Sequence, residues 1–182
     1  MADEQLVVLL NGPAGVGKTT VGRRLAATAR NGVCIHGDDI KRFVVRREPG
    51  TVPDGMTYAA GAVLSDLYLT AGYDLVVFEF VFSTLENIVR FHEVMTTVVP
   101  VRLLTLWASL DTVRAREAGR SNNESPGDRV TDCWHELHAN LEQLGTVVDA
   151  EQSPEDVVRT AVELMLPDAA SLAVQLQRVD RG

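Results

Sequence analysis

Apolar residues gather in five short runs along the chain, at residues 5–11, 32–36, 74–82, 101–108 and 146–149. Runs such as LVVLL and LVVFEFVF are almost continuously apolar, as expected for strands that are covered on both faces. Helical spacing of apolar residues between the runs predicts helices over residues 18–30, 38–45, 56–71, 83–95, 111–120, 127–144 and 153–166. This alternation predicts an α/β fold, with a doubly wound parallel sheet between layers of helices.

The last predicted helix has a recognisable start. Ser153 is the expected N-cap, Pro154 occupies the first helical position, and Asp156 follows three residues after the cap.

The length of 182 residues suits one domain, and we assign residues 1–182 to it. Two polar segments rich in turn formers, RREPGTVPDG at 46–55 and SNNESP at 121–126, are expected to be mobile covers over a site. We therefore predict an acceptor-side region at about 38–60, a lid at about 111–130, and a tail at 167–182 that could form one more helix.

Charge and cysteine content narrow the classes of partner. The formal net charge of −8 argues against nucleic acid and favours a small ligand held by local positive charge. Cys34 and Cys133 have neither CxxC spacing nor paired histidines nearby, so we expect no disulfide framework or zinc site. The N-terminal MADEQLVVLLNG lacks the basic start of a signal peptide and the length of a membrane span. We expect a cytoplasmic protein without a membrane partner.

A glycine-rich motif, GPAGVGKT at residues 12–19, follows the first predicted strand and matches GxxxxGK[ST] at every fixed position. Its glycines let successive backbone N–H groups point at phosphate oxygens, and the following helix adds its positive end. Lys18 is expected to reach the β- and γ-phosphates, and the Thr19 hydroxyl to bind Mg²⁺. The predicted nucleotide-binding residues are Gly12, Pro13, Ala14, Gly15, Val16, Gly17, Lys18, Thr19 and Thr20.

The motif does not specify what receives the phosphoryl group. The Asn-Lys-x-Asp guanine-reading motif of GTPases is missing from the sequence, and a motor or remodelling ATPase would usually be larger. The size favours a small kinase.

The stretch HGDDIKRF at residues 36–43 supplies two carboxylates where the second predicted strand ends. In a kinase, a carboxylate at this edge can accept the proton of the acceptor hydroxyl, so Asp38 and Asp39 are candidate bases. We favour Asp38, because Lys41 follows it by three residues on the same helix face and could also hold the acceptor. The alternatives are that an aspartate only caps the helix, and that Lys41 is a solvated surface residue.

Glu79 is a lone acid within the apolar third strand, where it needs a partner. It suits either water-mediated binding of Mg²⁺ or a hydrogen bond to the acceptor. A buried structural acid paired with an arginine is the alternative.

Three arginines flank the SNNESP segment: Arg116 and Arg120 at i and i+4, and Arg129 beyond it. Guanidinium groups brought onto a transferring phosphoryl group stabilise its charge, so we predict a catalytic role for them. The alternative is a solvated helix face. His135 and His138 lie three apart with no third ligand in view, and we interpret them as surface or packing residues, like Trp107 and Trp134.

These motifs resemble a family of small P-loop kinases that includes polynucleotide kinase, the zeta toxins, gluconate and shikimate kinases and chloramphenicol phosphotransferase. The segments that carry the likeness to the last enzyme are LNGPAGVGK, Arg-Glu-Ala-Gly-Arg at 116–120 and Gly-Asp-Arg-Val at 127–130. The resemblance implies ATP and Mg²⁺, a sheet in the order 2-3-1-4-5, a catalytic aspartate after the second strand, and lid arginines. It supports both aspartates: the polynucleotide kinase pattern points to Asp38, and the chloramphenicol kinase pattern to Asp39.

Two departures from the chloramphenicol kinase pattern bear on the acceptor. Glu79-Phe80 stands where that enzyme has an Asp-Asp pair, and SNNESP lengthens the lid. We therefore expect another antibiotic or hydroxylated natural product as the acceptor.

The leading hypothesis is an ATP-dependent O-phosphotransferase that acts on a hydroxyl of a small molecule, with antibiotics among the candidates. The second is a kinase of a nucleotide sugar or of a polynucleotide end. The third is a nucleotide-sensing regulatory protein without catalysis. No motif indicates the acceptor or the oligomeric state.

Overall fold

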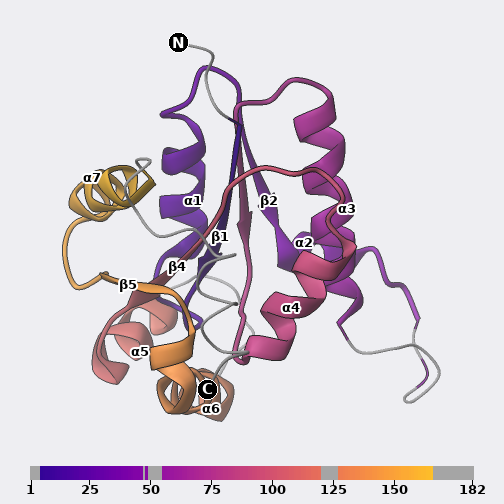
Figure 1. Ribbon diagram of the computed structural model, residues 1–182. Helices are drawn as coiled ribbons and strands as arrows, with labels where there is room; N and C mark the ends of the chain where they lie inside the picture. The colour runs from indigo at the N-terminus through magenta and orange to yellow at the C-terminus, as the bar shows by residue number, and fades with distance from the viewer. Residues whose placement is uncertain (1–4, 47, 49–54, 120–126, 166–182) are drawn as a thin grey trace.

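The computed structural model describes residues 5–46, 48, 55–119 and 127–165. Strands and helices alternate over these residues, as the apolar pattern predicted (Figure 1). In chain order the elements are β1 (Leu6–Asn11), α1 (Lys18–Ala26), β2 (Gly32–His36), α2 (Gly37–Arg42), α3 (Met56–Thr70), β3 (Leu75–Glu79), α4 (Leu85–Val94), β4 (Val101–Trp107), α5 (Leu110–Ala118), α6 (Gly127–Asn140), the 3₁₀ turn η1 (Leu141–Gln143), β5 (Thr146–Asp149) and α7 (Pro154–Met165).

The strands form one parallel sheet in the order β2-β3-β1-β4-β5, which confirms the predicted fold class and strand order. Parallel strands bring their carboxyl ends to the same edge. The loop after β1, helix α2 after β2, and the last residue of β3 therefore meet at that edge, where open α/β sheets bind ligands.

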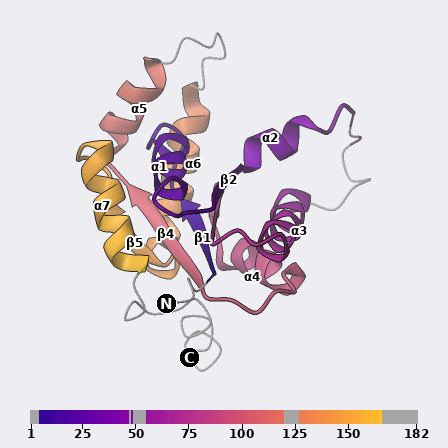
Figure 2. The ribbon, with the colours of Figure 1, turned by 90° about the horizontal axis from the view of Figure 1, so that it is seen from above.

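Helices cover both faces of the sheet, with α1 and α7 on one and α3 and α4 on the other (Figures 1 and 2). Strand β1 shows why its sequence is continuously apolar. Val8 and Leu10 pack into the core cluster shared with α1 and α7, whereas Val7 and Leu9 pack into the cluster shared with α3 and α4. Because both faces are buried, no position of the strand can be polar without a partner.

Several elements end earlier than predicted, among them α1, α2, α6 and β3. Helix α1 stops at Ala26 instead of residue 30, because the chain folds back so tightly that a Cβ on Gly32 would lie 1.8 Å from the Ala26 carbonyl oxygen. Strand β3 ends at Glu79 instead of residue 82. The apolar run continues past the strand because Phe80 and Phe82 are still core residues.

The fully buried Asn11 side chain fixes this extension of β3 beside β1. Its amide donates to the Phe82 carbonyl at 3.0 Å and to the Thr105 hydroxyl at 3.1 Å, and its carbonyl accepts from the Phe82 N–H at 2.8 Å. These bonds satisfy backbone groups that have left the sheet ladder.

The predicted start of α7 is confirmed, since the Asp156 N–H donates to the Ser153 hydroxyl and the helix begins at Pro154. Cys34 and Cys133 are free thiols, and each is partly exposed. Within the described ranges, no helix combines the length and the apolar character needed to cross a bilayer.

Replacing Asn11 by Ala should lower the free energy of unfolding by about 2–4 kcal/mol, because two buried backbone groups of Phe82 lose their partner. Chemical denaturation measures this loss. The control is Asn140→Ala, which removes one exposed bond to the Glu136 carbonyl and should change stability by less than about 0.5 kcal/mol. Equal effects of the two substitutions would contradict this account of Asn11.

Candidate active site at the carboxyl edge of the sheet

The P-loop between β1 and α1 takes the shape that its glycines permit. Gly12, Gly15 and Gly17 all have positive φ, of 140°, 83° and 105°. Gly15 also lies against α5, where a Cβ would meet the Val113 carbonyl oxygen at 2.4 Å. The loop therefore depends on glycine both for its conformation and for its contact with α5.

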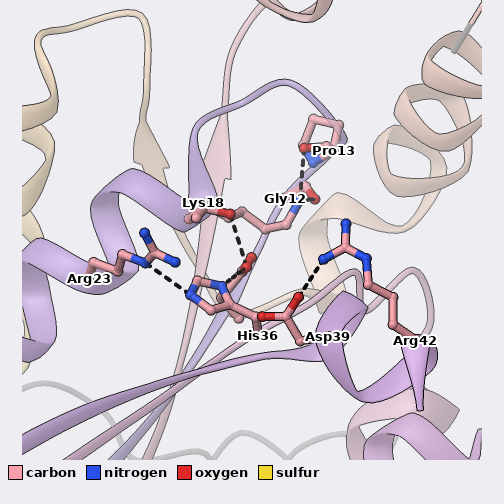
Figure 3. Close-up of polar contacts among 9 residues, drawn as sticks. Gly12, Pro13, Lys18, Arg23, His36, Asp39 and Arg42 are labelled. Carbon is pink, nitrogen blue, oxygen red and sulfur yellow. Dashed lines mark hydrogen bonds and ion pairs between the residues drawn. The ribbon is translucent and has the colours of Figure 1, made fainter. Parts of the chain in front are cut away.

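Lys18, the first residue of α1, extends back across the loop (Figure 3). Its ammonium group donates to the carbonyl oxygens of Gly12 at 2.8 Å and Pro13 at 3.0 Å. Lys18, the predicted phosphate-binding lysine, is thus held over the P-loop.

Glu79 ends β3 beside this loop and is 6% exposed. The Thr19 hydroxyl donates to its Oε1 at 3.1 Å, so two predicted ligands of Mg²⁺ are neighbours. Among the described residues its partners are Thr19 and His36 rather than an arginine, which contradicts the structural alternative of an arginine-paired acid. The contact with Thr19 of α1 places Glu79 beside the P-loop.

His36, the last residue of β2, is a site residue that the sequence reasoning missed. It is the register partner of Glu79, and its Nδ1 lies 2.5 Å from Oε1 of that carboxylate. The Nε–H of Arg23, on α1, donates to the other ring nitrogen, Nε2, at 3.2 Å (Figure 3). The sequence signal for His36 is its position at the end of β2. That position indicates a contact with Glu79 only when the register between β2 and β3 is known.

Cys34 lies two residues before His36 on the same strand. Burial, and then the negative charge of Glu79, raise the pKa of its thiol to about 12. Cys34 is therefore neutral at physiological pH and adds no negative charge beside Glu79.

The two aspartates lie in the first turn of α2, which begins at Gly37 with His36 as its N-cap. Neither aspartate caps the helix through its side chain, so the capping alternative was wrong. The Asp39 carboxylate is 2.5 Å from an Arg42 nitrogen (Figure 3). Asp38 is the more exposed of the two and lies 4.0 Å from the Lys41 ammonium, the i,i+3 neighbour that we predicted.

Phe80 joins α2 to the end of β3. A Cβ on Gly37 would lie 2.3 Å from the Phe80 ring, so α2 can begin this close to β3 only with glycine there. The Lys41 ammonium lies 4.5 Å from the centre of the same ring, and Tyr58 of α3 packs against it edge-on at 5.3 Å. The acceptor-side region thus combines an aromatic surface with one ammonium group.

The predicted arginine cluster is described only in part. The Arg116 guanidinium donates to the carbonyl oxygens of Val16, in the P-loop, at 3.2 Å and of Ala150, after β5, at 2.9 Å. Arg129 is an exposed residue in the first turn of α6. Arg120 and the SNNESP segment lie outside the described residues, as does most of segment 46–55.

The histidines and tryptophans near the lid pack together, as predicted. Trp134 stacks on His138 with centroids 4.8 Å apart, contacts His135 edge-on, and lies 4.9 Å from Trp107. Its indole N–H donates to the Ala108 carbonyl, which fixes α6 on the end of β4.

Comparison with known proteins identifies the family of this chain. The model of the AAA domain family matches residues 7–144, from β1 through η1. This chain belongs to the AAA domain family. A comparison with curated proteins gives no match.

Solved structures share the fold of this AAA domain. They include a tunicamycin resistance protein from Deinococcus radiodurans, with a TM-score of 0.64, 20% identity, and coverage of 91% of this chain and 99% of the other. A sugar kinase from Janibacter sp. HTCC2649 has a TM-score of 0.63 and 18% identity, covering 88% and 93%. A gluconokinase from Sinorhizobium meliloti 1021 has a TM-score of 0.57 and 19% identity, covering 86% and 89%. The fold is thus that of P-loop small-molecule kinases.

The AAA domain also offers ligands that suit Mg²⁺. Among the described residues no group of three His, Cys, Asp or Glu side chains could hold a metal ion. The adjoining oxygens of Thr19 and Glu79 fit Mg²⁺ instead, because this ion takes one or two protein oxygens and completes its shell with phosphates and water.

Gly15→Ala should abolish binding of a fluorescent ATP analogue, because a methyl group there displaces α5 or the loop. The matched control is Gly72→Ala, which has a similar φ of 89° with no atom within 4 Å. It should cost about 1 kcal/mol of stability through strain alone and leave nucleotide affinity unchanged. Retention of full nucleotide affinity by the Gly15 variant would show that this contact does not shape the loop.

Proposed function

We propose that the protein is an ATP-dependent O-phosphotransferase that moves the γ-phosphoryl group of ATP to a hydroxyl of a small molecule. The observation that carries the proposal is the meeting, at one edge of the sheet, of a P-loop with its Thr19–Glu79 pair and an α2 turn with two carboxylates. A phosphoryl donor and a proton acceptor are both required for such a transfer.

On the donor side, Lys18 exchanges the carbonyl oxygens of Gly12 and Pro13 for phosphate oxygens when ATP binds. The P-loop N–H groups bind the remaining phosphate oxygens. Thr19 and Glu79 would hold Mg²⁺, which neutralises the charge of the phosphates.

On the acceptor side, Asp38 accepts the proton of the attacking hydroxyl. Its carboxylate has only a loose contact with Lys41, whereas the Asp39 carboxylate is bound to Arg42 and orients the turn. The Lys41 ammonium also binds a polar substituent of the acceptor, beside the Phe80 ring. This division agrees with the preference for Asp38 from the sequence.

Arginines complete the site during transfer. Arg116 is anchored to the P-loop through the Val16 carbonyl, and Arg120 and Arg129 follow it in the chain. Their guanidinium groups stabilise the charge on the transferring phosphoryl group.

We propose a hydroxylated natural product as the acceptor, with antibiotics as the first class to test. The aromatic surface of Phe80 and Tyr58 favours an acceptor with an apolar face. One protein of the same fold is a tunicamycin resistance protein, and another is a sugar kinase.

The test is mass spectrometry of antibiotics, nucleosides, nucleotide sugars and sugar acids after incubation with the protein, ATP and Mg²⁺. We expect a hydroxylated natural product to gain one phosphoryl group and the Lys18→Met protein to give none. Tight ATP binding without transfer to any compound would contradict the proposed activity. Transfer only to nucleotide sugars or polynucleotide ends would keep the activity and overturn the acceptor class.

Asp38→Asn should lower kcat for the identified acceptor by about 10²–10⁴-fold, because the hydroxyl loses its proton acceptor. Asp39→Asn, which removes the ion pair with Arg42, should lower kcat by less than about 10-fold. Steady-state kinetics of both variants decides between the two aspartates. Full activity in both would refute the assignment of the base to this turn.

The chain's two lysines provide a second matched pair. Lys18→Met should raise the Kd for ATP by about 10-fold or more, because the phosphates lose their ammonium partner. Lys41→Met should leave the Kd for ATP unchanged and raise the KM for the acceptor. Calorimetry with ATP and kinetics with the acceptor separate the two effects, and the reverse pattern would overturn the division into donor and acceptor sides.

A further inference from the structure

A chain of side-chain contacts runs from Arg23 through His36 and Glu79 to Thr19. Arg23 and Thr19 both belong to α1, four residues apart, whereas His36 and Glu79 end two neighbouring strands. The ring and the carboxylate are largely buried, with side-chain exposures of 13% and 7%. The contacts therefore close a loop that ties the ends of β2 and β3 to the first turns of α1.

The direction of the hydrogen bonds follows from Arg23. Its Nε carries one hydrogen and can only donate, so Nε2 of His36 must accept and cannot carry a proton. The imidazole proton is then on Nδ1, from which it is donated to Oε1 of Glu79. His36 is therefore a neutral imidazole that donates to the Glu79 carboxyl group.

Both hydrogen bonds that the described residues give this carboxylate go to Oε1, one from His36 and one from Thr19. Because two donors hold Oε1 in place, the plane of the carboxylate is fixed, and this plane also fixes the position of Oε2. A carboxylate held in this way is oriented before any ligand arrives.

We propose that His36 is a positioning residue for the phosphoryl-transfer site: it orients Glu79 toward Thr19, and Arg23 selects the ring tautomer that allows this. This inference rests on the proposed function for its effect on the reaction, but its structural part can be tested on the protein alone. His36 is also the N-cap of α2, two residues before Asp38. Fixing its ring therefore sets the start of the acceptor-side helix relative to the donor-side carboxylate.

The structural part is tested by nitrogen-15 NMR of the imidazole rings at neutral pH, with the His36 signals assigned by their loss in His36→Asn. We expect a protonated Nδ1 and a bare Nε2 for His36. Arg23→Leu should shift the Nε2 resonance, because that nitrogen loses its donor. Arg24→Leu is the matched control, since Arg24 is also exposed on α1 but pairs with Glu155 of α7, and it should leave the resonance unchanged.

The functional part is tested by two substitutions of His36. Asn places an amide N–H where Nδ1–H was and should keep kcat within about 3-fold, whereas Leu removes the donor and should lower kcat by about 10-fold or more. The KM for ATP in the presence of Mg²⁺ should change by less than about 3-fold in the Asn variant. Thermal melting of both variants confirms that they fold.

Three results would overturn the proposal: an Nε2–H tautomer in the wild-type protein, an Nε2 resonance that does not respond to Arg23→Leu, or equal kcat values for the Asn and Leu variants. If the wild-type protein transfers phosphate to no acceptor, the proposed function fails. The NMR result then still decides whether Arg23 and His36 hold Glu79 as described.

Discussion

The site depends on one buried carboxylate. Glu79 is the last residue of the apolar strand β3, and a buried carboxylate is tolerated there because Thr19 and His36 donate to it. These two bonds connect three neighbouring segments, the ends of β2 and β3 and the first turn of α1. The carboxylate is therefore both the main polar constraint on this edge of the sheet and the group that faces the P-loop.

The parallel topology explains why the groups proposed for the donor and acceptor sides lie together. In the order β2-β3-β1-β4-β5, β3 stands between the strand that leads to the P-loop and the strand that leads to α2. Phe80, the residue after Glu79, packs against Gly37 and Lys41. The dipeptide Glu79-Phe80 thus links the P-loop helix to α2, since its acid contacts Thr19 and its ring contacts Lys41.

The elements were predictable because a strand buried on both faces must be continuously apolar, as β1 is. The P-loop was predictable because its glycines are needed for positive φ. The end of β3 was not predictable, because the apolar run continues to Phe82 after the strand has ended. Phe82 is held there by hydrogen bonds to Asn11, which lies 71 residues away in sequence. His36 was missed for the same reason. Its role depends on the hydrogen bond to Glu79, 43 residues further along the chain, and no local spacing in the sequence indicates that contact.

The most direct test of the account is the affinity for ATP measured by calorimetry with and without Mg²⁺, in the wild type and in Glu79→Gln. Gln keeps an oxygen for Thr19 and His36 but removes the charge. The account predicts that Mg²⁺ tightens ATP binding to the wild-type protein and that most of this gain is lost in the variant. An undiminished effect of Mg²⁺ in Glu79→Gln, or no effect in the wild type, would contradict it.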